Sequence, residues 1–186
     1  LEAFSDGVLA IVITIMVLEL KVPHGDSFEV LQNLFPVFLS YILSFVYIAI
    51  YWNNHHHMIH TCKSVTGGIL WANLHLLFWL SLVPFSTGWM GENHFTSVPT
   101  LLYGLNLLFA ALAYFVLQRT IIHSQGKNSI LKKAIGSDWK GRVSPLIYNA
   151  AIAASLWTPM VALLLYALLA LIWIVPDQRI EKVYRQ

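Results

Sequence analysis

The chain has 186 residues, of which 58% are hydrophobic and only 11% are charged, against roughly 25% charged residues in ordinary soluble domains. So little polar surface cannot cover a globule in water, which excludes most soluble folds and indicates a protein dissolved in lipid. The net charge of +2 is too small to indicate a nucleic-acid partner, and the single cysteine, Cys62, excludes an internal disulfide and a cysteine-rich zinc site.

Apolar runs with few or no charges, about 20 residues long, predict membrane spans, because that length of helix crosses about 30 Å of hydrocarbon. Four such runs are plain: 4–22, 36–61, 68–89 and 98–118. Residues 143–175 then contain no Asp, Glu, Lys or Arg, and this stretch is too long for one crossing. Because Pro159 lies near its middle, we expect two short helices, 143–157 and 159–175, joined by a tight hairpin.

The basic residues indicate the orientation of these spans, because Lys and Arg accumulate in cytoplasmic loops. Six spans place only Lys21 on one side of the membrane and ten basic residues on the other. These ten are Lys63, Arg119, Lys127, Lys132, Lys133, Lys140, Arg142, Arg179, Lys182 and Arg185. We therefore expect one all-α, six-span domain over residues 1–186, with both termini cytoplasmic.

The first span opens with the polar motif Phe4-Ser5-Asp6. Ser5 and Asp6 lie in the first turn, where they can cap free backbone N–H groups and meet the positive end of the helix dipole. Capping alone is enough to explain them. With Glu2 and Asp6 the run is also too acidic at its start for a signal peptide, so we expect it to be a retained span.

One face of the same span carries a mostly apolar stripe with 0, 3, 4, 7 spacing. The stripe consists of Ile11, Thr14, Ile15 and Leu18. Such a stripe is far more often a packing face than a pore lining. The pattern alone therefore leaves both readings open.

Histidines gather at the end of the second span, where residues 52–60 read Trp-Asn-Asn-His-His-His-Met-Ile-His. His56 and His60 are one turn apart, and histidine both binds metals and carries protons near neutral pH. No Asp or Glu is near them in the sequence, so a polar cluster that ends the span is the alternative. In the third span, His75 is either functional or a buried neutral histidine bonded to another helix, and Asn73 lies two residues away.

Several catalytic and transport motifs are missing. The sequence has no Gly-x-x-x-x-Gly-Lys phosphate loop, no Gly-x-Ser-x-Gly elbow and no His-Glu-x-x-His helix. The Thr-Val-Gly-Tyr-Gly carbonyl filter of ordinary potassium channels is also absent. We therefore expect no enzyme activity, no catalytic residue, no bound cofactor and no metal.

Three elements occur together in chain order: Phe4-Ser5-Asp6 opens span one, Trp52 with His55-His56 ends span two, and Asn73 precedes Pro84-Phe85-Ser86-Thr87 in span three. In this combination the chain resembles the prokaryotic members of the transmembrane protein 175 family, the endolysosomal potassium channels. The similarity covers essentially the whole chain. It implies a homotetramer whose first spans line a central pore without a re-entrant loop.

The resemblance also implies roles for single residues. The family's pore constriction is apolar, and the matching positions are Ile11, Ile15 and Leu18, with a hydroxyl added by Thr14. By similarity, Phe4, Ser5 and Asp6 form a network of hydrogen bonds that holds the pore helix, and Asn73 and His75 are expected as partners in it. The permeant ions would be K⁺ and, with modest discrimination, other monovalent cations.

Two rival readings depend on the histidines instead. One is a proton or metal transporter that uses them as carriers. The other is a membrane redox protein with haem or metal bound by His56, His60, His75 or His123, which needs facing pairs at similar depth.

Overall fold

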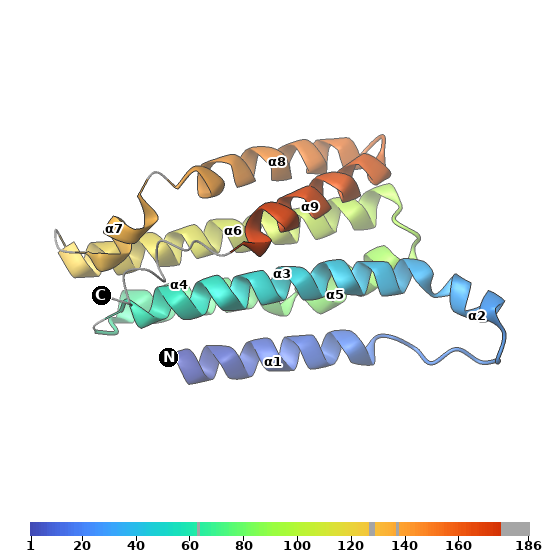
Figure 1. Ribbon diagram of the computed structural model, residues 1–186, viewed down its shortest axis with the longest axis horizontal. Coiled ribbons are helices and arrows are strands. Elements are labelled where there is room, and N and C mark those ends of the chain that lie inside the picture. The colour runs from blue at the N-terminus through green and yellow to red at the C-terminus, as the bar shows by residue number, and fades with distance from the viewer. Residues whose placement is uncertain (63, 127–128, 137, 176–186) are drawn as a thin grey trace.

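A computed structural model describes residues 1–62, 64–126, 129–136 and 138–175 (Figure 1). All the regular secondary structure in these ranges is helical. The helices are α1 (Glu2–Leu18), α2 (Phe28–Asn33), α3 (Phe35–His60), α4 (Gly67–Ser81), α5 (Val83–Glu92), α6 (Ser97–Gln125), α7 (Ile130–Ile135), α8 (Trp139–Ser155) and α9 (Pro159–Ile174). Five of the basic residues used for the orientation lie outside the described ranges: Lys63, Lys127, Arg179, Lys182 and Arg185.

Three helical stretches in the described ranges are long and apolar enough to cross a membrane: Phe35–His60, Gly67–Glu92 and Ser97–Gln125. α9 is apolar but shorter. The first helix ends at Leu18 rather than at residue 22, and α6 continues past residue 118 to Gln125. The short helices α2 and α7 form in segments that the sequence analysis left as loops.

The third predicted span is bent at Leu82, where α4 passes into α5. The cause is Pro84, which lacks an N–H and so interrupts the hydrogen bonds of a continuous helix. Asn106 of α6 lies against the bend. When the side-chain amide of Asn106 is oriented so that both its nitrogen and its oxygen have partners, the nitrogen donates to the Trp79 carbonyl at 2.9 Å. The oxygen then accepts from the Val83 N–H at 3.3 Å.

The last two helices form a hairpin with a turn of three residues, Leu156 to Thr158. α9 begins at Pro159, whose missing N–H costs nothing in the first turn of a helix. α8 begins earlier than residue 143, because the Asp138 carboxylate accepts a hydrogen bond from the Gly141 N–H at 3.0 Å and caps the helix.

The helices lie side by side along one long direction, with α1 on one edge of the bundle and the α8–α9 hairpin on the opposite edge (Figure 1). α1 packs against α3, α4 and α5. The start of α1, the α3–α4 connection and α7 share one end of the bundle, and α2, the α5–α6 connection and the α8–α9 turn share the other (Figure 1). α1 is therefore peripheral in a single chain, with one side against its neighbours and one side open.

α5 approaches α3 closely at Gly91. A Cβ placed there would lie 2.8 Å from the Val37 Cα and would also collide with the Ser40 hydroxyl. Since a backbone atom cannot move aside, we expect Gly91→Ala to cost about 1–3 kcal/mol of stability and to lower the melting temperature of the purified protein. Gly88→Ala on the same helix is the matched control, because a Cβ there meets nothing within 4 Å. Equal melting temperatures for the two variants would contradict the close packing.

Candidate functional site

α1 has one buried face, formed by Ser5, Leu9, Val12 and Met16. These four residues follow the 3.6-residue period of a helix and pack toward α3, α4 and α5. The buried face fixes the rotation of α1 about its own axis. It therefore also decides which side chains α1 turns outward.

The outward face of α1 carries the stripe that the sequence spacing singles out. Ile11, Ile15 and Leu18 are 59%, 42% and 75% exposed, and Thr14 is exposed as well. The Thr14 hydroxyl donates to the Ala10 carbonyl at 2.9 Å. From Ile11 to Leu18 the stripe extends about 10 Å along the helix axis. In a single chain these side chains are unpacked, so the stripe is available to lipid or to other copies of the chain.

Ser5 anchors the start of α1 through a buried chain of hydrogen bonds. Its hydroxyl donates to the Leu1 carbonyl at 3.1 Å and accepts from the Asn73 amide nitrogen at 2.9 Å. The Asn73 side-chain oxygen lies 2.7 Å from Nε2 of His55. Because that oxygen can only accept, His55 carries its proton on Nε2. Ser5 and Asn73 are fully buried and His55 is 1% exposed, so this chain ties together α1, α3 and α4 where water cannot replace it.

Asp6 makes a second link to α3, in which the Trp52 indole N–H donates to its carboxylate at 2.9 Å. We expect Asp6→Ala to remove this bond and to weaken the attachment of α1, at a cost of about 1 kcal/mol, because Trp52 is 44% exposed and its N–H can turn to water. The measurement is the melting temperature together with the fraction of assembled protein in detergent. An unchanged melting profile and assembly would remove Asp6 from this role.

The sequence-based site assignments differ from the structure at two of the five positions outside the stripe. Phe4 is 56% exposed and takes no part in the hydrogen bonds of Ser5 and Asp6. His75 does not face them either: its Nε2 accepts from the Trp79 indole at 3.0 Å on the exposed side of α4. The reason is geometric, because residues two apart on a helix point in different directions, so Asn73 and His75 cannot share a site.

Trp52 and His55 complete the links to α1, although the sequence analysis did not expect them as partners of that helix. Their position at the end of a span suggested a polar boundary. No spacing rule says which of three consecutive histidines faces another helix. In the structure it is His55 that turns toward α4, and His56 turns toward α1.

Glu2 meets the histidines from another helix, which corrects the expectation that no carboxylate is near them. Its Oε1 lies 2.9 Å from His56 Nδ1 and 3.0 Å from His60 Nε2. The side chain is distant from both histidines in the sequence and reaches them because the first turn of α1 packs beside the last turns of α3. His75 and His123, the other two histidines considered as ligands, are exposed on α4 and α6 and are not part of this group.

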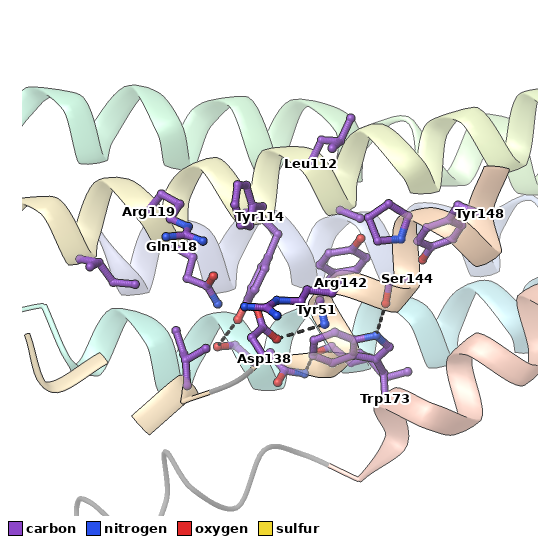
Figure 2. A pocket seen from close by; sticks show the side chains of 18 of the residues that line it. Tyr51, Leu112, Tyr114, Gln118, Arg119, Asp138, Arg142, Ser144, Tyr148 and Trp173 are labelled. Atoms are coloured by element: carbon purple, nitrogen blue, oxygen red, sulfur yellow. Dashed lines mark hydrogen bonds between the residues drawn. The ribbon is translucent and has the colours of Figure 1, made fainter. Parts of the chain in front are cut away.

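A cavity of about 540 Å³ lies on another side of the bundle, between α3, α6 and α8 (Figure 2). Tyr51, Gln118 and Arg142 line it, and Trp173 of α9 closes one side, where its indole N–H donates to the Ser144 hydroxyl at 2.9 Å. No residue of α1 lines this cavity. The outward stripe of α1 and the cavity are therefore separate features.

The amino-acid sequence of the chain is similar to those of known potassium channels. Residues 1–84, which include the stripe of α1 and the links to α3 and α4, match the sequence model described as "Endosomal/lysosomal potassium channel TMEM175". A potassium channel of Chryseobacterium sp. (strain P1-3) is 57% identical over 182 residues, which are 98% of this chain and 95% of that protein. A potassium channel of Streptomyces collinus (strain DSM 40733 / Tue 365) is 34% identical over 121 residues, 61% of this chain and 59% of that protein.

The fold is also similar to a solved structure. The crystal structure of a lysosomal potassium-selective channel TMEM175 homolog from Chamaesiphon minutus superposes with a TM-score of 0.81. The two chains are 27% identical, and the match covers 95% of each. The similarity therefore extends over nearly the whole chain.

Proposed function

The chain belongs to the TMEM175 potassium channel family, and from that premise we propose that it conducts K⁺ passively through a homotetrameric pore lined by α1. It is a channel and not an enzyme. The single observation that carries the proposed pore is the outward stripe of α1, which is exposed in one chain while the opposite face of the helix is bonded to α3 and α4.

Symmetry explains how such a peripheral stripe can become an ion pathway. Fourfold rotation about an axis beside α1 would bring four copies of Ile11, Thr14, Ile15 and Leu18 face to face. Each ring then needs only one side chain from each chain. The hydrogen bonds of Ser5 and Asp6 support this arrangement, because they hold α1 at one rotation and keep the same side chains turned toward the axis.

An apolar ring controls conduction through the water inside it. A narrow ring of Ile11 side chains tends to lose its water, and an ion passes only where it can keep or replace part of its hydration shell. K⁺ gives up water more readily than Na⁺, so such a neck favours K⁺ modestly. Thr14 adds hydroxyl groups next to the ring. The sharp discrimination of a carbonyl filter is not expected here.

The topology that we propose has six spans, with both termini in the cytoplasm and the protein in the prokaryotic cell membrane. Arg119, Lys132 and Lys140 support it, because they belong to the end of α6, α7 and the start of α8, on the side of the bundle where α1 begins (Figure 1). The proposed partners are K⁺ and other monovalent cations, the lipid bilayer and three further copies of the chain. Conduction of this kind requires no resident cofactor.

The test is the flux of K⁺ and of Na⁺ from purified protein in liposomes, with the number of chains per particle measured on the same preparation. We expect four chains per particle and a passive K⁺ flux that exceeds the Na⁺ flux by a modest factor. A flux that saturates and requires a counter-gradient would instead indicate a transporter, and a particle without fourfold stoichiometry would contradict the proposed pore.

A further inference from the structure

Three side chains from two helices converge at the end of the bundle where α1 begins. Glu2 comes from the first turn of α1, and His56 and His60 come from the last two turns of α3. One oxygen of Glu2 lies 2.9 Å from Nδ1 of His56 and 3.0 Å from Nε2 of His60. The two imidazole rings meet edge to face along one side of α3, with 4.5 Å between their centroids.

The contact between Glu2 and His56 is close without being a hydrogen bond. Within the described ranges, Nδ1 of His56 is a buried atom for which no hydrogen-bond partner is found, although the Glu2 oxygen is 2.9 Å away. When His56 carries its proton on Nε2, its Nδ1 and the Glu2 oxygen both offer a lone pair at this point. A cation at this point would be coordinated by both.

The donor set selects the kind of cation. One carboxylate oxygen and two imidazole nitrogens are ligands of Zn²⁺, whereas K⁺, Mg²⁺ and Ca²⁺ prefer sites made of oxygen. Zn²⁺ bound at about 2.0–2.1 Å by tetrahedral ligands requires about 3.3 Å between the ligand atoms. All three ligand atoms here lie within 4.8 Å of one another. An outward movement of Glu2 by a few tenths of an ångström brings its oxygen to that spacing.

We propose that Glu2, His56 and His60 form a Zn²⁺ site that joins the first turn of α1 to the end of α3. The three side chains are 33%, 35% and 48% exposed, so an ion from the solution can reach them, and water can occupy the fourth position. Trp52 packs beside the site, with its ring 5.8 Å from that of His56, and bonds Asp6 one turn further along α1. Bound Zn²⁺ thus reinforces the attachment of α1 that Ser5 and Asp6 already provide.

This site has a consequence for conduction that rests on the proposed function. α1 carries the stripe of Ile11, Thr14, Ile15 and Leu18, so a widening of the pore in which α1 moves within its own chain changes its position relative to α3. Zn²⁺ bound between the two helices resists that movement. We therefore expect Zn²⁺ on the side of the membrane where α1 begins to lower the K⁺ flux.

The first experiment measures binding alone, in purified protein in detergent. Zn²⁺ is titrated into the wild type by calorimetry, and Co²⁺ is added in parallel to follow its visible absorption as a probe of tetrahedral nitrogen and oxygen ligands. We expect one Zn²⁺ per chain, and affinity at least about tenfold weaker in Glu2→Gln and in His60→Gln. His123→Gln is the matched control, because His123 is an exposed histidine outside the group, and it should bind as the wild type does.

Each result of the titration has a definite meaning. Equal affinity in the wild type, Glu2→Gln and His60→Gln would overturn the site, as would a wild type that binds no Zn²⁺. Size-exclusion profiles and helical content, measured on the same samples, show whether a variant has lost affinity by unfolding. Both substituted side chains are partly exposed, so we expect these profiles to be unchanged.

The second experiment measures K⁺ flux from liposomes with and without Zn²⁺. We expect Zn²⁺ to lower the flux through the wild type and through His123→Gln, and to leave His60→Gln unaffected. Binding without any change in flux would overturn the regulatory role but not the site. Binding with no K⁺ flux under any condition would contradict the channel proposal, so the two failures are distinguishable.

Discussion

Replacing Ile11 with asparagine is expected to raise the K⁺ conductance several-fold and to lower the ratio of K⁺ to Na⁺ permeability. An apolar ring resists wetting, and its energy barrier falls when each of four side chains offers an amide to water. Hydrated Na⁺ then passes almost as easily as K⁺. The measurement is ion flux from liposomes, or currents in planar bilayers, under gradients of each ion in turn.

Ile11→Val is the control for this change, because it keeps the ring apolar and removes only one methylene from each chain. We expect its selectivity to remain near that of the wild type. If Ile11→Asn and the wild type had the same flux and the same permeability ratio, Ile11 would not form the constriction. The rings of Ile15 and Leu18 would then be the next positions to substitute.

Asn73→Leu should be the most destabilising single change among the residues that hold α1. It removes the hydrogen bond that Ser5 accepts and leaves the His55 Nε2–H without a partner at the point where three helices meet. The Ser5 hydroxyl keeps its bond to the Leu1 carbonyl, whereas a buried polar group left unsatisfied, as at His55, costs about 1–3 kcal/mol. Water cannot replace the lost bonds, because Ser5, Asn73 and His55 are at most 1% exposed. The measurement is the melting temperature of the assembled protein in detergent, followed by size-exclusion chromatography.

Asn149→Leu serves as the control for that experiment. Asn149 is exposed on α8 and donates to the Pro145 carbonyl of its own helix at 2.7 Å, so its loss leaves no buried partner on another helix unsatisfied. A wild-type melting temperature for Asn73→Leu would show that the buried hydrogen bonds do not hold α1 in place.

The longer helices could be located from the sequence because each corresponds to a long apolar run with few or no charged residues. Proline marks several of the boundaries between these runs. Pro159 opens α9 after a short turn, as the uncharged stretch around it indicated. The six-residue helices α2 and α7 were missed, since elements of that length carry too few turns to show a period and depend on tertiary context. The bend at Leu82 follows from Pro84, but the role of Asn106 there depends on a contact between α4, α5 and α6 that no local pattern encodes.

For the site, periodicity identified which residues of α1 share a face, and the structure places Ile11, Ile15 and Leu18 on its outward side. Periodicity could not decide whether that side meets lipid or a pore, which is why the family relationship carries the proposal. The partners of α1 were harder still to predict. His75 was selected for its depth in a span, whereas the contact belongs to His55, and the meeting of Glu2 with His56 and His60 depends on how two distant segments pack.

The central claim, that ions pass along the outward stripe of α1, is tested most directly by a thiol placed at Ile11. Cys62→Ser removes the native cysteine, and Ile11→Cys then places one thiol in each chain. The account predicts that Ag⁺, with nitrate as the anion, blocks K⁺ flux through this variant and spares the matched variant with Val161→Cys on the exposed side of α9. Unchanged K⁺ flux through protein whose thiol at position 11 is fully occupied by silver would contradict it.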